Sequence, residues 1–234
     1  MRLAIIASTL CSLIQADSTS SESKRLELKI IRHQPCTSKP PANERIRFSP
    51  IEKAPLVEDT EKGDGYYSIS GPVQVKKSIK GTVQVYVQVR SGSKGPIEKC
   101  SNADKDKCGG VGSCIYCDIC LSMKQLEKTS STRVTVERGG KRMDCTEGLE
   151  AGNYTDIKIA FRMPTKKEFL EAEGIDNEIW NSNSQGGHPF FMTIFIFNKP
   201  VNTLSNDELQ KIASDDSEEI IGCHRLVGSL REAS

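Results

Sequence analysis

The amino-acid sequence predicts an all-β protein, a two-sheet β-sandwich held by disulfides, with a few short helices in its loops. Several segments alternate apolar and polar residues with the period of two that is typical of β-strands. An even number of cysteines remains once a predicted signal peptide is removed, and only three short helical segments can be placed. Many short strands with few helices favour a sandwich.

Length and charge limit the possible classes of protein. The chain has 234 residues, 36% of them hydrophobic, which is enough to bury the core of one domain. Its formal net charge is +1, and the two signs are mixed along the chain. The composition therefore gives no bulk electrostatic attraction to nucleic acid or to an anionic membrane.

The N-terminus has the layout of a secretory signal peptide. An early arginine precedes an uncharged apolar run over residues 3–14, and the small residue Ala16 follows. We therefore expect residues 1–16 to be removed. The run is well short of the roughly 20 residues that a membrane-spanning helix needs, which disfavours a membrane anchor. The sequence thus predicts a secreted or lysosomal protein, in which a polar segment over residues 17–30 leads into the first strand.

Eight of the nine cysteines lie outside the predicted signal peptide, and in an oxidising compartment they would form four disulfides. Three of them, in "GSCIYCDIC", are spaced two residues apart, as in some iron–sulfur and zinc sites. The sequence after Cys120 lacks the fourth cluster ligand, and the three histidines are scattered, so neither a metal nor a cofactor is expected. The eight cysteines are Cys36, Cys100, Cys108, Cys114, Cys117, Cys120, Cys145 and Cys223.

The longest alternating segment lies on both sides of Lys80-Gly81 and predicts a β-hairpin with a tight turn there. Further strands are expected over residues 133–138, 153–164, 189–200 and 224–231. In the first segment, one face would carry Val83, Val85, Val87 and Val89, and the other Gln84, Tyr86 and Gln88. In the strand within 153–164, one face would carry Ile157, Ile159 and Phe161.

Two capping-box patterns predict helices, because a hydroxyl residue is followed three residues later by a glutamate. Thr165 would start a helix over Lys166–Glu173, and Ser205 would start one over Asn206–Ala213. After Cys114, the apolar residues Ile119, Met123 and Leu126 recur at helical spacing. The acidic run "SDDSEE" that precedes the last strand is typical of a solvated loop.

The segment "FFMTIFIF" is apolar on both faces of the strand that it predicts. One face carries Phe190, Met192, Ile194 and Ile196, and the other carries Phe191, Phe195 and Phe197 around Thr193. A central strand covered on both sides would have this pattern. A strand with one face lining an apolar cavity would have it too, and the pattern alone does not separate the two interpretations.

Four segments, taken in order, resemble the ganglioside-activator-like members of the ML (lipid-recognition) β-cup family. The first, "GSCIYCDICLSM", carries a Gly-Ser-Cys with another Cys six residues on. The second, "CTEGLEAGNYTDIKIAFRMP", places Gly and Tyr before an alternating strand. The third is the loop of Trp180 with the strand that follows it, and the fourth is the closing "GCHRLVGSL". The resemblance implies a single lipid-binding β-cup over residues 31–230, with an apolar cavity between its sheets and a C-terminal tail over residues 231–234.

The resemblance also implies a disulfide scheme. Cys36 would pair with Cys223, and Cys120 with Cys145. Cys114 would pair with a cysteine at the end of the preceding strand, for which Cys100 suits better than Cys108, and Cys117 would then be left for Cys108. The segment 130–144 has no cysteine for the family's remaining bridge, so the pairing among these four cysteines stays open.

The function that the resemblance implies is the extraction of a glycolipid or phospholipid from a membrane, with transient contact to its surface. By the same resemblance, such a protein would serve a β-hexosaminidase-type hydrolase without being an enzyme itself. Trp180 would insert at the headgroup level, or else be buried beneath its loop. The cavity would be lined by Val85, Val87, Ile119, Met123, Ile157, Ile159, Phe161, Phe190, Met192, Ile194 and Ile196. An alternative is an extracellular protein-interaction module with a filled sandwich core.

No catalytic residue is expected, because the chain has no Gly-x-Ser-x-Gly elbow and its cysteines are paired. Structural or solvent-facing roles are expected for His33, His188 and His224, the first and last of which flank the expected Cys36–Cys223 bridge. Asn153-Tyr154-Thr155 is an N-glycosylation sequon, which agrees with a secretory route.

Overall fold

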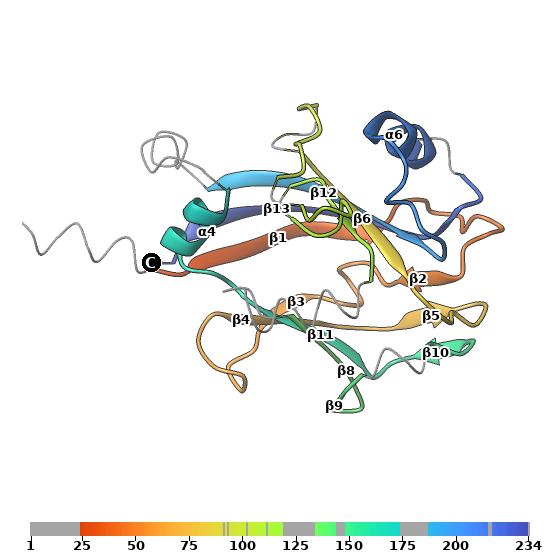
Figure 1. Ribbon diagram of the computed structural model, residues 1–234. Coiled ribbons are helices and arrows are strands. Elements are labelled where there is room, and N and C mark those ends of the chain that lie inside the picture. The colour runs from red at the N-terminus through yellow and green to blue at the C-terminus, as the bar shows by residue number, and fades with distance from the viewer. Residues whose placement is uncertain are drawn as a thin grey trace, which may run out of the picture.

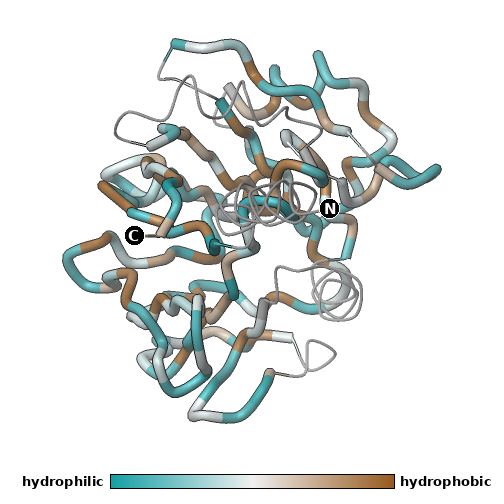
Figure 2. Tube along the Cα trace, turned by 90° about the vertical axis from the view of Figure 1, so that its left-hand side faces the viewer, coloured by the Kyte–Doolittle hydropathy of each residue, from teal (hydrophilic) through white to brown (hydrophobic). Residues whose placement is uncertain are grey.

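The computed structural model describes residues 24–90, 92, 94–101, 103–110, 112–118, 134–143, 148–173, 187–214 and 217–233. Within them lie thirteen strands and two helices, so the protein is all-β, as the sequence predicts. The strands form two layers that face one another (Figure 1). Apolar and polar residues alternate along many of them (Figure 2).

One layer is a five-stranded antiparallel sheet in the order β1-β13-β12-β6-β7. The predicted strand 189–200 lies at its centre as β12, flanked by the long final strand β13. Because both neighbours of β12 belong to the same sheet, its backbone hydrogen bonds are satisfied on both sides. The bounds are β1 Leu26–Pro35, β13 Ile220–Glu232, β12 His188–Phe197, β6 Gln84–Arg90 and β7 Ile115–Tyr116.

The other layer contains two antiparallel sheets that lie beside one another (Figure 1). The larger has the order β3-β4-β11-β8-β9, with bounds β3 Leu56–Glu58, β4 Tyr66–Ser70, β11 Ile157–Arg162, β8 Val134–Arg138 and β9 Lys141–Arg142. The smaller has the order β10-β5-β2, with bounds β10 Gly152–Tyr154, β5 Val73–Val75 and β2 Ile46–Phe48. The predicted strand over 153–164 is therefore two strands, β10 and β11, which belong to different sheets.

The predicted hairpin at Lys80-Gly81 is wrong. β5 pairs with β10 and β2, whereas β6 pairs with β12 and β7, so the chain passes from one layer to the other between them. Gly81 does turn the chain, with a φ of +83° that favours glycine. Both halves alternate because each buries one face in the same interior, and alternation does not specify which sheet a strand joins.

Both capping boxes form and start helices. The Thr165 backbone N–H donates to Glu168 Oε2 at 2.7 Å, and the Ser205 N–H donates to Glu208 Oε2 at 2.8 Å. The helices that follow are α4, Lys166–Glu173, and α6, Asn206–Ser214. The helix expected around Ile119, Met123 and Leu126 lies outside the described residues.

The two helices lie at different places on the sandwich (Figure 1). α6 covers the outer face of the five-stranded sheet, where Leu209 packs with Phe197 and Tyr86 in one buried cluster. α4 lies at the end that carries the C-terminus, where Leu170 packs with Leu26. Neither helix is long and apolar enough to cross a membrane.

Candidate functional site

The predicted apolar face of β12 points into the space between the layers and continues onto the neighbouring strand. Ile196 is paired with Val85, Ile194 with Val87, and Met192 with Val89, so each isoleucine or methionine lies beside a valine on the same face. The sequence therefore placed these residues on one surface correctly, although it had paired β6 with the wrong strand.

The facing sheet contributes a second apolar row from β11. Ile159 is paired with Ile69 on one side and Val136 on the other, and Phe161 is paired with Tyr67. The rings of Phe161 and Tyr67 are stacked, with centroids 6.2 Å apart. Both layers thus line the interior with aliphatic and aromatic side chains.

At one end of the sandwich these rows meet in a close-packed cluster. Three members come from strands that continue toward the middle of the interior, and all three are nearly inaccessible: Val85 is 7% exposed, Ile157 6% and Ile196 7%. We call this cluster the closed end, and it consists of Ile46, Val73, Val75, Ile79, Val85, Tyr154, Ile157, Ile196 and Ile221. Here the two layers are in direct contact.

One step further along the same strands, burial is incomplete. Val87, Ile194 and Ile159 are only half-buried, although each lies two residues from a closed-end residue on the same face. We call the half-buried inward residues the middle interior: Ile69, Val87, Val89, Val136, Ile159, Phe161, Phe190, Met192 and Ile194. Side chains of the described residues therefore leave part of this apolar surface uncovered.

A third apolar cluster lies beyond the middle interior, at the end that carries α4. Leu26, Met163 and Leu170 are buried there, and Phe161 and Tyr67 pack against them. The half-buried surface is thus bounded along the sandwich by a packed cluster at each end.

The opposite face of β12 is covered by the protein itself. Phe195 and Phe197 are 6% and 0% exposed, and they pack with Tyr86, Val201 and Leu209. β12 is therefore a central strand whose outer aromatic residues belong to a filled core. Burial also raises the pKa of the Tyr86 hydroxyl.

Three disulfides occur among the described residues. Cys36–Cys223 is the pair that the resemblance implies, Cys100–Cys114 is the pair that it favours, and Cys108–Cys117 joins the two cysteines that were then left over. The first ties the end of β1 to the final strand. The other two link residues before β7 to its two ends, because Cys114 precedes Ile115 and Cys117 follows Tyr116. Cys120 and Cys145, expected to form the fourth bridge, lie outside the described residues.

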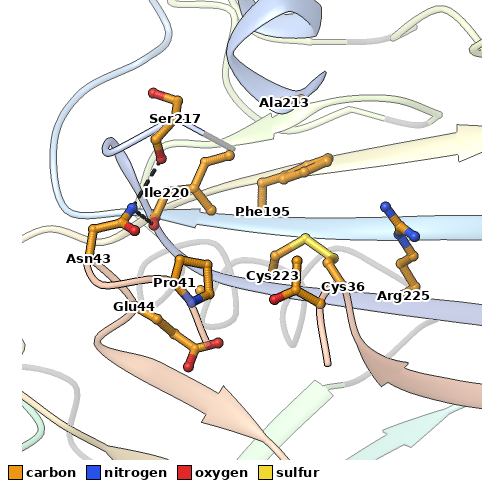
Figure 3. Close-up of a pocket in the computed structure, with 12 residues that line it drawn as sticks. Cys36, Pro41, Asn43, Glu44, Phe195, Ala213, Ser217, Ile220, Cys223 and Arg225 are labelled. Atoms are coloured by element: carbon orange, nitrogen blue, oxygen red, sulfur yellow. Dashed lines mark hydrogen bonds between the residues drawn. A yellow bond between two sulfur atoms is a disulfide. The ribbon is translucent and has the colours of Figure 1, made fainter. Parts of the chain in front are cut away.

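A small pocket lies beside the Cys36–Cys223 bridge (Figure 3). Phe195 and Ala213 line it from β12 and α6, and Arg225 lies at its side. The Asn43 side-chain amide donates to the backbone carbonyls of Ser217 and Ile220 at 3.1 and 2.8 Å, so it fastens the loop before β13. This pocket faces away from the middle interior, and none of the predicted lipid-binding residues line it.

Two histidines form a buried pair that the sequence indicates only by placing them near the same bridge. His33 on β1 and His224 on the neighbouring β13 are joined by a 3.0 Å hydrogen bond between His33 Nδ1 and His224 Nε2. Burial, together with the positive charge of nearby groups, lowers the pKa of His224 to about 4. No signal in the sequence predicts their direct contact.

Two other buried charged residues, Asp59 and Lys166, each have an ion-pair partner. Asp59 lies 2.7 Å from the Lys158 ammonium, and this hydrogen bond raises the pKa of Lys158. Lys166, at the start of α4, lies 2.6 Å from Glu232 at the end of β13. These pairs hold a loop and a helix in place. Among the described residues, no group of three histidine, cysteine or acidic side chains is placed to hold a metal ion.

The remaining predicted site residues divide into two groups. Asn153 is exposed on β10, the edge strand of the smaller sheet, where a glycan is sterically tolerated. Trp180, Ile119 and Met123 lie outside the described residues. Comparison with protein-family models gives no match, and comparison with curated proteins gives none either.

Proposed function

We propose that this protein is a lipid-binding and lipid-transfer protein, which takes a glycolipid or phospholipid from a membrane and holds its acyl chains in the middle interior. One observation carries the proposal: inward apolar residues on both layers stay half-buried, whereas residues two positions away on the same strands are buried. A sandwich whose interior served only to stabilise the fold would gain stability by burying both the closed-end residues and the middle interior.

The energetics favour an acyl chain as the missing part of the core. Each methylene moved from water into an apolar surrounding contributes about 0.8 kcal/mol, so a chain of ten contributes on the order of 8 kcal/mol. The middle interior is lined by Ile, Val, Met and Phe side chains, which offer such a surrounding without directional bonds. Selectivity among lipids would then come from headgroup contacts at the rim.

The proposal includes a secreted or lysosomal location, brief contact with a membrane surface, and a non-catalytic role beside a hydrolase of the β-hexosaminidase type. The order of the cysteine-bearing segments supports these parts, together with the Cys36–Cys223 and Cys100–Cys114 disulfides, which agree with the resemblance. Disulfides persist in oxidising compartments, which agrees with a secretory route.

The test is native mass spectrometry of the secreted, disulfide-intact protein, followed by organic extraction. We expect one phospholipid or glycolipid per chain, either co-purified or taken up from mixed vesicles. A mass that stays that of the lipid-free chain after incubation would contradict lipid binding. It would favour the alternative, a protein-interaction module with a filled core.

A matched pair of variants locates the lipid. Met192→Trp adds bulk within the middle interior, whereas Thr193→Trp places the same indole ring on the opposite face of the same strand. Displacing about two lipid methylenes should weaken binding roughly tenfold in the first variant. Equal binding by the two variants would show that the lipid does not lie against β12.

A further inference from the structure

The buried histidine pair lies where three parts of the chain meet. His33 is 2% exposed and His224 is 8% exposed. They belong to the neighbouring strands β1 and β13, and the loop over residues 49–54 closes over them. His33 Nε2 lies 2.6 Å from the Ala54 carbonyl oxygen, so this single ring connects β13 to that loop.

The contacts fix the position of each proton. A carbonyl oxygen can only accept, so His33 Nε2 carries the hydrogen that Ala54 receives. His33 Nδ1 is then the acceptor, and His224 Nε2 donates to it. This leaves His224 Nδ1 as a bare nitrogen, buried and without a hydrogen-bond partner. Both hydrogen bonds of His33 are therefore made with the two rings neutral, and an added proton on His224 Nδ1 gains no bond.

The surroundings disfavour an added proton. Burial lowers the pKa of His224 most, and positive charge at His33 and at Arg47 of β2 lowers it further. Phe48, also from β2, packs edge-on against the His224 ring at 5.9 Å. Glu44 precedes β2, and its carboxylate is held by Arg47 at 2.8 Å and by Lys76 at 2.9 Å. The flanking groups Lys53 and Arg225 are exposed cations, and β12 presents the apolar Ile194 beside His224.

We propose that the His33–His224 pair is a pH-sensitive latch that holds the two layers together and releases them on acidification. At this junction the Ile51 N–H donates to the His33 carbonyl, and the Arg45 N–H donates to the Ile221 carbonyl. β2 also packs so closely on β13 that a Cβ at Gly222 would lie 2.6 Å from Ile46. A proton trapped between these elements separates them, because water can solvate the charge only when the junction opens.

The direction of the pH effect follows from proton binding. In the closed form the pKa of His224 is about 4, whereas a solvated histidine titrates near 6.5. The open form binds more protons between these values, so closure is fully favoured above about pH 6.5 and is progressively lost as the pH falls toward 4. The ratio of open to closed form rises by at most about tenfold per pH unit, and by about 40-fold from pH 6.5 to 4.5.

The latch deepens the proposed function, and its role in lipid exchange rests on that function. β2 carries Ile46, which belongs to the closed end, and opening the junction uncovers the interior from that side. An acidic compartment would then speed the exchange of lipid between the middle interior and a membrane. At neutral pH the closed junction would retain it.

The experiment compares the stability of wild type, His224→Gln and His188→Gln between pH 7.5 and 4.5 by denaturant unfolding with disulfides intact. A glutamine amide can donate to His33 Nδ1 as His224 Nε2 does, but it does not titrate. Between pH 6.5 and 4.5, we expect the folding equilibrium constants of the wild type and of His188→Gln to fall about 40-fold more than that of His224→Gln. Parallel losses in all three proteins would overturn the latch.

A second measurement needs only the wild-type protein and so survives poor folding of a variant. Histidine ring signals followed by NMR should show a His224 that remains neutral down to about pH 5. A His224 ring that titrates near 6.5 in the folded protein would overturn the proposal, because its protonation would then meet no resistance.

Transfer of a fluorescent phospholipid between phosphatidylcholine vesicles at pH 6.5 and 4.5 tests the link to lipid exchange. Faster transfer at pH 4.5 in wild type, but not in His224→Gln, is the expected result. Absence of transfer at either pH, with the stability difference intact, would overturn the proposed function and leave the latch standing. Transfer that accelerates equally in both proteins would overturn the latch's role in exchange.

Discussion

The closed end and the middle interior are built from the same strands, yet they differ in how completely they are filled. Val85 and Val87 are the same residue type, two positions apart on one face of β6, and only the first is buried. Ile196 and Ile194 repeat this difference on β12. The side-chain period of two determines which face a residue occupies, whereas the distance between the layers at that point determines whether it is packed.

The largest expected effect tests what holds the closed end together. Replacing both Cys36 and Cys223 by serine removes a bridge between residues 187 positions apart. The loop-entropy model gives a loss on the order of 5 kcal/mol, as an upper value, because the unfolded chain regains its freedom. Denaturant unfolding measures the loss. Replacing Cys108 and Cys117, only nine positions apart, is the matched control and should cost less.

Two alanine substitutions in β12 test the difference in packing between the closed end and the middle interior. Ile196→Ala leaves a cavity in a packed cluster and should cost about 3 kcal/mol of unfolding free energy. Ile194→Ala removes the same atoms from a half-buried site and should cost roughly half as much or less, since part of the side chain already contacts solvent. Chemical denaturation of the lipid-free protein checks both values, and equal losses would contradict the division into closed end and middle interior.

The same division explains what the sequence predicts and what it does not. Alternation identified β6, β8, β11, β12 and β13, together with the faces of Ile157, Ile159 and Phe161, because each strand buries one side. It failed at Lys80-Gly81, where two alternating segments are close in sequence but join different layers. Local pattern determines facing, and pairing depends on distant partners such as β12 and β10.

The incomplete burial of the middle interior and the His33–His224 hydrogen bond cannot be predicted from the local sequence pattern, for a related reason. The apolar sequence of β12 is the same whether the facing sheet touches it or stands apart, so half-burial at Ile194 could not be predicted. His33 and His224 are 191 positions apart, and their hydrogen bond depends on the register of β1 with β13, including the bulge between Ile30 and Arg32. The capping boxes succeeded because both partners lie within four residues.

A smaller effect on stability is expected from weakening α6, which covers the outer face of the five-stranded sheet. Ser205→Ala removes the cap of α6, which should cost about 1 kcal/mol because the Glu208 backbone N–H loses its acceptor, Ser205 Oγ. Since α6 packs on the outer face of β12, lipid binding in the middle interior should be unchanged. Thermal unfolding with and without lipid measures both quantities. A loss of lipid binding equal to that of Met192→Trp would mean that the outer and inner faces are coupled.

The smallest effect concerns β10, where one residue faces outward and the next belongs to the closed end. Asn153 is exposed, whereas Tyr154 is buried and its hydroxyl donates to the Glu150 carbonyl at 2.7 Å. Asn153→Gln should abolish the mass shift that an N-glycosidase produces in the secreted protein, and it should change the unfolding free energy by less than about 0.5 kcal/mol. Tyr154→Phe keeps the ring and loses only the hydrogen bond, so it should cost about 1 kcal/mol. A greater loss for Asn153→Gln than for Tyr154→Phe would mean that the outward face of β10, and not the closed end beneath it, stabilises this edge of the sandwich.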